Sequence, residues 1–285
     1  MKKIYNDYIK WFIENSLKED VGDGDFTSNA CITENSISKA KLLVKDHGVI
    51  AGVQLSKMIF EYMDPDTEFE ILKEDGSIVA YGDIVFTVKC NTRTLLKAER
   101  LVLNIMQRLS GISTVSSEFA FEVQDLPVKI LDTRKTTPLL RPLEKWAVRI
   151  GGCYNYRDGL YDWIMIKDNH IDAAGGIKNA IDRVQKYLKE NNLDLGITIE
   201  VRNLVELNEV LERGDVTRIM LDNFELAILK EAVCTIDKRY ETEASGGVTL
   251  QTIRAIAETG VDYISVGALT HSAGILDLSL KIIKT

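Results

Sequence analysis

Lysine and arginine side chains gather in one stretch of a chain that is otherwise acidic. The 285 residues include 35 Lys and Arg against 43 Asp and Glu, which gives a formal net charge of −8. Residues 131–169 nevertheless contain a dense series of cations: Arg134, Lys135, Arg141, Lys145, Arg149, Arg157 and Lys167. Fixed positive charges that are held close together repel one another unless a ligand neutralises them. The cluster therefore predicts a polyanionic small-molecule ligand.

Short apolar runs precede two groups of these polar residues. Residues 128–131 lead into Asp132-Thr-Arg-Lys, and residues 163–166 lead into Lys167-Asp-Asn-His. Runs of this length are typical of buried strands, and α/β barrels keep their chemistry at the C-terminal ends of such strands. We therefore expect both groups at the rim of one barrel.

The C-terminal part of the chain alternates strand-like and helix-like segments. The strand-like segments are 128–131, 163–166, 197–201, 218–221, 240–244 and 262–266, and helical stretches such as 204–213 and 250–259 separate them. This order predicts parallel strands with crossover helices. Six such units favour an α/β barrel that is incomplete, or that has a cryptic strand, over an eightfold barrel.

Polar, charged or small residues also follow the later strand-like segments. They are Glu200 with Arg202, Asp222-Asn223, Ser245-Gly246-Gly247 and Ser265-Val-Gly267-Ala-Leu-Thr270. Glycine permits a close approach of the backbone, and free N–H groups in such loops bind phosphate. The last two loops together predict a phosphate cradle, although each alone also suits a plain tight turn.

The N-terminal part has a different pattern. Residues 39–53 and 67–90 contain short β segments with Asp-Gly and Tyr-Gly-Asp turns, which predicts a small α+β unit. A helical stripe of apolar residues over 92–110 follows, and Gly111 is expected to end that helix. Periodicity alone places Arg100 on the polar face of this helix, exposed to solvent.

Composition argues against several other classes of function. The acidic balance argues against a general nucleic-acid or anionic-membrane surface, and no segment has the pattern of a signal peptide or a bilayer span. Cys31, Cys90, Cys153 and Cys234 are widely separated and form no CxxC pair, so we expect reduced thiols in the cytoplasm and no zinc site. The expected partners are small molecules, with no nucleic acid and no membrane.

Three motifs carry a resemblance to a known family. They are DTRKTTP at 132–138, IKDNHI at 166–171 and SVGALTHS at 265–272, and further matches from EDVGDGDFTS at 19–28 onward cover most of the chain. On these motifs the chain resembles the quinolinate phosphoribosyltransferase family. The resemblance implies a type II phosphoribosyltransferase fold, with an N-terminal α/β sandwich-like domain at 1–112 and an incomplete C-terminal α/β barrel at 113–274. A tail at about 275–285 is expected to pack back on the first domain.

The resemblance also implies a reaction and its site. Family members join quinolinate to the anomeric carbon of phosphoribosyl pyrophosphate, release pyrophosphate with Mg²⁺, and lose carbon dioxide to give nicotinate mononucleotide. The matching substrate-binding positions are Arg100, Arg134, Lys135, Tyr156, Arg157, Lys167, Ser245, Gly246, Gly247, Ser265 and Gly267. Lys135, Glu200 and Asp222 match catalytic positions, and the last two are also the expected Mg²⁺ ligands. A homodimer, or a higher oligomer built from dimers, is implied, and Arg100 should enter the site of the other subunit.

Two positions depart from the usual pattern of the family. Tyr156 stands where histidine is usual, so that a hydroxyl replaces an imidazole at the acceptor site. Arg202 stands where glutamate is usual, and we expect it either to pair with Glu200 or to contact an additional anionic group. Both changes leave open a related phosphoribosyltransferase that uses another aromatic or heterocyclic acid. The alternative from another enzyme class is a Schiff-base aldolase that uses Lys135 or Lys167, and their cationic neighbours argue against it.

Several other polar residues have a simpler structural explanation. Lys145 and Arg149 lie at i and i+4 of an expected helix and are expected to be ordinary surface charges. His170 and His271 follow strand ends, where either an acid role or a structural hydrogen bond would fit. The acidic residues at 19–25 are expected to form a capped turn rather than a metal site.

Overall fold

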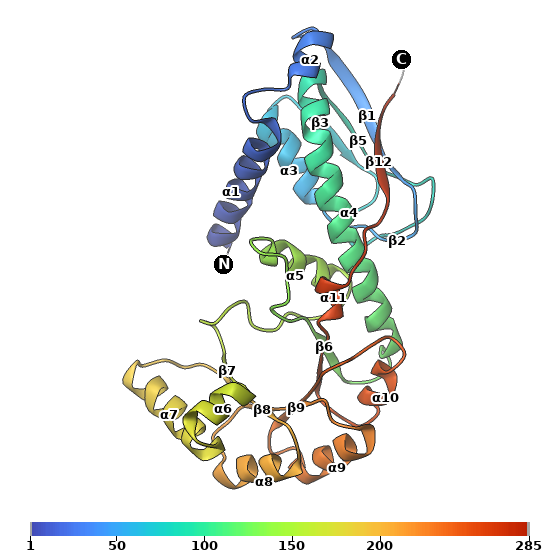
Figure 1. Cartoon of the computed structure of the whole chain (residues 1–285). Helices are drawn as coiled ribbons and strands as arrows, with labels where there is room; N and C mark the ends of the chain where they lie inside the picture. Colours follow the sequence, from blue (N-terminus) through green and yellow to red (C-terminus); the bar gives the residue numbers. More distant parts are fainter. Residues whose placement is uncertain (1, 284–285) are drawn as a thin grey trace. The chain divides into compact units, whose positions relative to one another are not determined.

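A computed structural model of the chain describes residues 2–283, which form two compact units (Figure 1). The first unit contains the described residues up to Thr114 and those from Gly274 onward, and the second runs from Val115 to Ala273. Met1 and the last two residues of the expected C-terminal tail lie outside the described residues. The two units are built on different sheets.

The first unit is organised around a four-stranded antiparallel sheet. Its strands, in spatial order, are β12 (Leu278–Ile282), β1 (Ile37–Val44), β5 (Ile84–Asn91) and β3 (Glu68–Ile71). A separate two-stranded ribbon pairs β2 (Gly48–Val49) with β4 (Ile78–Val79). These strands confirm the short β segments expected over 39–53 and 67–90.

The first unit also contains helices, of which α3 packs against the sheet through aromatic side chains. The helices are α1 (Lys2–Val21), α2 (Phe26–Cys31), α3 (Val53–Met63) and α4 (Thr92–Glu122). Phe60 of α3 lies 6.1 Å from Phe69 of β3, whose ring is in turn 4.4 Å from that of Phe86 in β5 (centroid distances). Helix α2 begins with a capped turn, as expected, because the Asp25 carboxylate accepts a hydrogen bond from the Ser28 N–H at 2.9 Å.

Helix α4 is longer than the sequence predicts. Its end was expected at Gly111, but the helix continues to Glu122. A Cβ added at Gly111 would lie 2.0 Å from the carbonyl oxygen of Gly274. The glycine therefore lets the backbone that precedes β12 contact the helix, and it does not act as a C-cap.

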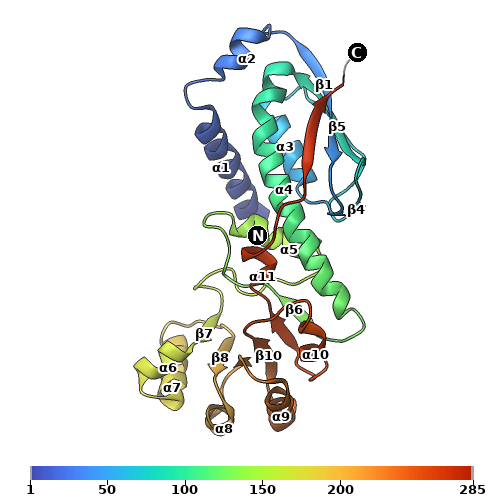
Figure 2. The same ribbon diagram turned by 45° about the vertical axis from the view of Figure 1, so that its right-hand side comes forward.

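The second unit contains a curved sheet of six parallel strands (Figure 2). In spatial order they are β6 (Lys129–Leu131), β11 (Tyr263–Ser265), β10 (Glu241–Ser245), β9 (Arg218–Asp222), β8 (Ile197–Val201) and β7 (Ile164–Ile166). β6 and β7 lie at the two ends of this order and do not pair with each other, so the barrel is open within the described chain. The expected incomplete α/β barrel is confirmed.

Helices follow these strands along the chain. They are α5 (Arg141–Ile150), α6 (Asp168–Ala174), α7 (Ile177–Glu190), α8 (Leu204–Arg213), α9 (Leu226–Ile236), α10 (Ile253–Ala257) and α11 (Ala268–His271). In Figures 1 and 2, α7, α8 and α9 cover the outer side of the sheet. Every residue of β8 is buried, as expected for a parallel strand covered on both faces. Among the described residues, no helix is long and apolar enough to cross a membrane.

We expect Gly111→Ala to destabilise the first unit, although alanine is the better helix former by about 1 kcal/mol. The new Cβ would collide with the Gly274 carbonyl group, and overpacking typically costs about 1–3 kcal/mol. Urea denaturation should therefore show a lower midpoint. Asn104→Ala, at an exposed position of the same helix, should not lower it. Unchanged or higher stability of Gly111→Ala would show that the contact is not tight.

Candidate active site

A cavity of about 620 Å³ lies at the C-terminal ends of the barrel strands. The expected site residues that line it are Arg134, Lys135, Tyr156, Arg157, Lys167, Glu200, Asp222, Ser245, Gly246, Gly247, Ser265 and Gly267. Parallel strands all end at the same edge of a sheet, which explains why residues far apart in sequence converge here. Arg100 does not line this cavity. It belongs to α4 in the first unit, where its side chain is exposed, as periodicity predicts.

The cationic side of the cavity combines residues from two loops and from one strand end. Arg134 and Lys135 follow β6, and Lys167 follows β7. Arg157 belongs to the loop between α5 and β7, and its guanidinium donates to the carbonyl oxygen of Trp163 at 3.2 Å. Burial lowers the pKa of Arg157, and the charge of Arg134 lowers it further. These cations repel one another in the protein alone, so the arrangement favours binding of an anion.

The acidic side consists of two carboxylates at the ends of neighbouring strands, Glu200 in β8 and Asp222 in β9. Burial raises the pKa of Glu200; Lys167, at 3.7 Å, opposes this rise, and Asp222 adds to it. No group of three or more His, Cys, Asp or Glu side chains in residues 2–283 could hold a metal ion. A divalent cation at Glu200 and Asp222 would therefore need further oxygen ligands from a substrate.

Two glycines keep the other wall of the cavity open. A Cβ on Gly246 would lie 2.2 Å from the side-chain oxygen of Asn223, and one on Gly267 would lie 2.9 Å from Nε2 of His271 and 3.1 Å from Cδ of Lys135. Gly246 also has φ of 100°, which other residues rarely adopt. Larger residues would therefore displace the polar groups that line the cavity.

Asn223 is a cavity residue to which the sequence assigned no role. It has φ of 56°, and asparagine tolerates this left-handed conformation better than most residues. Its N–H donates to the Ser245 carbonyl at 2.8 Å, and its side-chain amide donates to Asp222 at 2.6 Å. Asn223 thus ties the acidic pair to the glycine loop. Its place directly after a strand, beside Asp222, was the signal that could have identified it.

Tyr156 joins the cavity to the interior of the barrel. Its hydroxyl lies 2.6 Å from Oγ1 of Thr198, which also accepts a hydrogen bond from the indole N–H of Trp163 at 2.9 Å. Burial, and then the charge of Glu243, raise the pKa of Tyr156. The hydroxyl therefore stays neutral. The centroid of the Tyr156 ring lies 5.1 Å from the guanidinium carbon of Arg218.

Charged side chains from the barrel strands form a network beneath the cavity, in which Arg218 and Glu243 are buried. The sequence patterns did not predict this network. Arg218 pairs with Glu243 at 3.2 Å and with Glu241 at 2.9 Å, and it stacks on Tyr263 at 3.7 Å from the ring centroid. Glu243 also accepts a hydrogen bond from the hydroxyl of Ser265, which lines the cavity. A buried charge needs such partners to offset its desolvation.

Arg202 does not form the ion pair with Glu200 that was one of the two roles expected for it. Its guanidinium lies 2.6 Å from Glu206 and 3.3 Å from Asp172, and it does not line the cavity. The expectation of a pair with Glu200 relied on strand alternation, but β8 ends at Val201.

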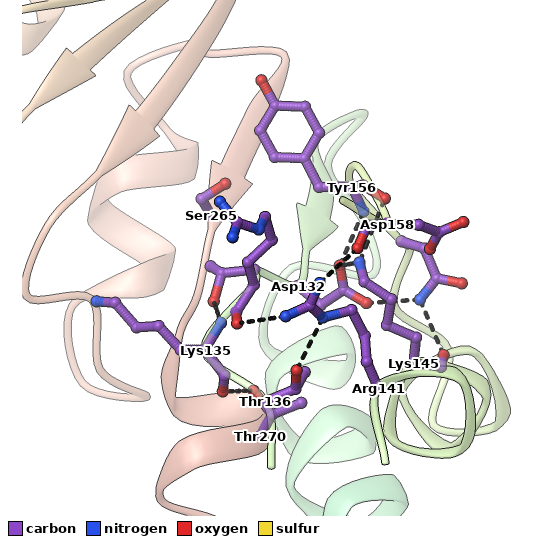
Figure 3. A network of polar contacts seen from close by, with 12 residues as sticks. Asp132, Lys135, Thr136, Arg141, Lys145, Tyr156, Asp158, Ser265 and Thr270 are labelled. Atoms are coloured by element: carbon purple, nitrogen blue, oxygen red, sulfur yellow. Dashed lines mark hydrogen bonds and ion pairs between the residues drawn. The ribbon is translucent and has the colours of Figure 1, made fainter. Parts of the chain in front are cut away.

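The surface role expected for Lys145 is wrong. The Lys145 side chain is 3% exposed and lies 2.5 Å from the fully buried carboxylate of Asp132 (Figure 3). Arg149, four residues later, is exposed as expected. Helical spacing alone could not distinguish these positions, because the partner of Lys145 comes from the end of β6. His170 makes a structural hydrogen bond, since its Nδ1 accepts from the Lys167 N–H at 3.0 Å, whereas His271 lines the cavity.

An open α/β barrel with four cations, two carboxylates and two glycine loops at its rim defines an enzyme for phosphorylated and carboxylated small molecules. Comparison with known proteins narrows this class. Residues 25–110 match the N-terminal domain of quinolinate phosphoribosyl transferase, and residues 112–281 match its C-terminal domain. The chain belongs to the quinolinate phosphoribosyltransferase family.

Individual relatives match over almost the whole chain. The decarboxylating quinolinate phosphoribosyltransferase 1b of Nicotiana tabacum is 47% identical, over 96% of this chain and 82% of its own. The probable carboxylating nicotinate-nucleotide pyrophosphorylase of Bacillus subtilis is 40% identical, over 96% and 93%. The solved structure of nicotinate-nucleotide pyrophosphorylase from Francisella tularensis has a TM-score of 0.90 at 35% identity, and the match covers 98% of this chain and 97% of that chain. The resemblance read from the motifs is confirmed, and it argues against the aldolase alternative.

We expect Tyr156→Phe to lower the free energy of unfolding by about 1 kcal/mol, the net value of one hydrogen bond. The loss should stay this small because Thr198 keeps its bond to Trp163. Chemical denaturation measures the change. Tyr161→Phe removes a hydroxyl from a side chain that is 76% exposed and should have no effect. Equal stability of both variants would contradict a structural role for the Tyr156 hydroxyl.

Proposed function

We propose that this chain transfers the phosphoribosyl group of phosphoribosyl pyrophosphate to quinolinate, with loss of carbon dioxide, to give nicotinate mononucleotide for NAD biosynthesis. The observation that carries the proposal is the convergence of four cations, two carboxylates and two glycine loops on one cavity. Relatives that match 96% of the chain are named for this reaction.

The cationic side suits the acceptor. Quinolinate has two neighbouring carboxylates on a flat ring, and the planar guanidinium groups of Arg134 and Arg157 can each bind two carboxylate oxygens. Lys167 adds a third positive charge on the same cavity. A dianion bound here would relieve the repulsion that lowers the pKa of Arg157.

The acidic side suits Mg²⁺ together with the donor. Mg²⁺ is usually bound by one or two carboxylates and by substrate phosphates, and Glu200 and Asp222 supply such a pair. A cation near both carboxylates would relieve the repulsion that contributes to the raised pKa of Glu200. When bound, Mg²⁺ would neutralise charge on the pyrophosphate. The open loops at Gly246 and Gly267 would accept the 5-phosphate.

The proposed reaction needs positioning more than covalent catalysis. The pyridine nitrogen attacks the anomeric carbon, the bond from that carbon to pyrophosphate breaks, and pyrophosphate leaves with the electron pair. Loss of the neighbouring carboxylate as carbon dioxide leaves an electron pair on the ring carbon beside the positive nitrogen, and a solvent proton adds there. Lys135, beside the Gly267 loop, is placed to stabilise negative charge on the phosphates.

A second candidate is a related transferase that acts on another aromatic acid. Tyr156 is the observation that favours it, because a neutral hydroxyl bonded to Thr198 replaces the usual imidazole at the acceptor side. Turnover of a panel of pyridine and other aromatic carboxylates separates the two candidates.

With phosphoribosyl pyrophosphate and Mg²⁺, we expect the purified protein to convert quinolinate and to release carbon dioxide and nicotinate mononucleotide in equal amounts, and chelation of Mg²⁺ should stop turnover. Arg134→Ala should weaken quinolinate binding by about 1.5–3 kcal/mol, the value of a hydrogen bond to a charged group, without lowering the melting temperature. Arg149→Ala is the exposed control. Turnover of another acid but not quinolinate would support the second candidate. Failure to bind phosphoribosyl pyrophosphate would reject both.

We also infer a homodimer, or a higher oligomer built from dimers, with Arg100 of one subunit completing the site of the other. The exposed side chain of Arg100 and its absence from the cavity lining support this arrangement. A cytoplasmic location remains a prediction from the cysteine pattern.

Mixing inactive Arg100→Ala subunits with inactive Lys167→Ala subunits should restore activity. A heterodimer would contain one site with both defects and one with neither, so it should show half of the wild-type rate. Steady-state assays after proven subunit exchange test this. No recovery would place Arg100 outside the partner's site.

A further inference from the structure

One face of α5 holds together the two loops that carry the acceptor-side cations. Arg141, Glu144 and Lys145 lie at i, i+3 and i+4, so their side chains share that face. None of the three lines the cavity. Their hydrogen bonds go instead to residues 132–137 after β6 and to the loop at 154–158. Figure 3 shows Arg141 and Lys145 among these residues.

Lys145 is linked to the loop at 154–158 by hydrogen bonds through Asp132. The Asp132 carboxylate accepts hydrogen bonds from Lys145 at 2.5 Å, from the Asn155 side chain at 2.6 Å and from the Tyr156 N–H at 2.8 Å. The Lys145 ammonium also donates to the Tyr156 carbonyl at 3.3 Å. Both backbone polar groups of Tyr156 are therefore held, and the direction of the next residue, Arg157, follows from them.

Glu144 and Arg141 of the same helix form hydrogen bonds with the segment that follows β6. Glu144 accepts from the Thr137 N–H at 3.0 Å and from the Thr137 hydroxyl at 2.8 Å. Arg141 donates to the Thr136 hydroxyl at 3.0 Å and to the Asp158 carbonyl at 2.7 Å, which links the two loops directly.

The charges explain why a buried lysine suits this place. Burial raises the pKa of Asp132, and the Lys145 ammonium is the largest of the effects that oppose this rise. The pair adds no net charge beside a cavity that already contains Arg134, Lys135 and Arg157. Buried ion pairs add little stability relative to apolar residues, and a role in fixing geometry accounts better for this one.

We propose that Lys145 is a positioning residue for the acceptor. Through Asp132 it holds Tyr156 and Arg157 against Arg134 and Lys135, so that their cations converge on one dicarboxylate instead of moving apart. The proposal rests on the proposed function for the identity of the acceptor. Among the described residues, no hydrogen bond joins this pair to the donor side, which is built from Glu200, Asp222 and the glycine loops.

The test compares Lys145→Met with Arg149→Met, which removes an exposed cation one turn later on the same helix. Lys145→Met should raise the KM for quinolinate about tenfold or more, equivalent to about 1.4 kcal/mol. The Kd for phosphoribosyl pyrophosphate with Mg²⁺, measured by calorimetry without acceptor, should stay within about twofold of wild type, since general damage to the fold would change both. Arg149→Met should match wild type in both. An unchanged quinolinate KM in Lys145→Met would overturn the proposal.

A double variant covers the case in which Lys145→Met alone fails to fold because Asp132 is left buried and uncompensated. Lys145→Met with Asp132→Asn removes both charges, so it should fold and still show the raised quinolinate KM. A wild-type KM in the double variant would overturn the proposal.

Hydrogen exchange provides a measurement that does not depend on the reaction. Amide exchange in peptides that cover 154–158 should be faster in Lys145→Met or the double variant than in Arg149→Met, because the Tyr156 N–H loses its fixed acceptor. If the wild-type protein did not turn over quinolinate, the proposed function would fail, and exchange would still decide the positioning role. Unchanged exchange at 154–158 would overturn it.

Discussion

Repulsion among fixed cations is the main electrostatic property of the candidate site. Arg134, Lys135, Arg157 and Lys167 line a single cavity, and two unit charges 4 Å apart differ in energy by about 4 kcal/mol from separated charges at an effective dielectric constant of about 20. Lys167 directly follows β7, whose backbone hydrogen bonds to the neighbouring strand limit its movement. Arg134, Lys135 and Arg157 belong to loops, and hydrogen bonds from α5 hold these loops in place. The cations therefore remain close together in the cavity, and a bound anion would relieve their repulsion.

The open side of the barrel contributes to the cationic side of the cavity. β6 and β7 do not pair with each other, and Tyr154 forms a parallel bridge to Leu131 at the free edge of β6. The chain that follows this bridge brings Tyr156 and Arg157 to the cavity. A closed barrel would place another strand where this loop now lies, so the missing strands make room for an acceptor-side wall.

Buried counter-charges stabilise the remaining polar groups. Asp132 offsets Lys145 beside the cavity, and Glu243 offsets Arg218 beneath it, while hydrogen bonds from Tyr156 and Ser265 complete the two networks. Each network holds a group that lines the cavity, Tyr156 in the first and Ser265 in the second. Such networks define one arrangement of side chains, since any other would leave a buried charge without a partner.

Sequence patterns and motifs predict the kind of fold and most of the residues expected at the candidate cavity. Alternating strand and helix patterns predicted an incomplete barrel, and residues directly after each strand converge because parallel strands end at one edge. Local patterns describe only neighbours along the chain, and this is where they failed. Gly111 was expected to end a helix, because local patterns do not include its contact with Gly274. Lys145 was expected at the surface, because its partner Asp132 is thirteen residues away in the sequence. Arg202 forms ion pairs with Glu206 and Asp172, and it forms none with Glu200. Such partners cannot be predicted from local patterns, because burial and pairing depend on which elements the fold brings together.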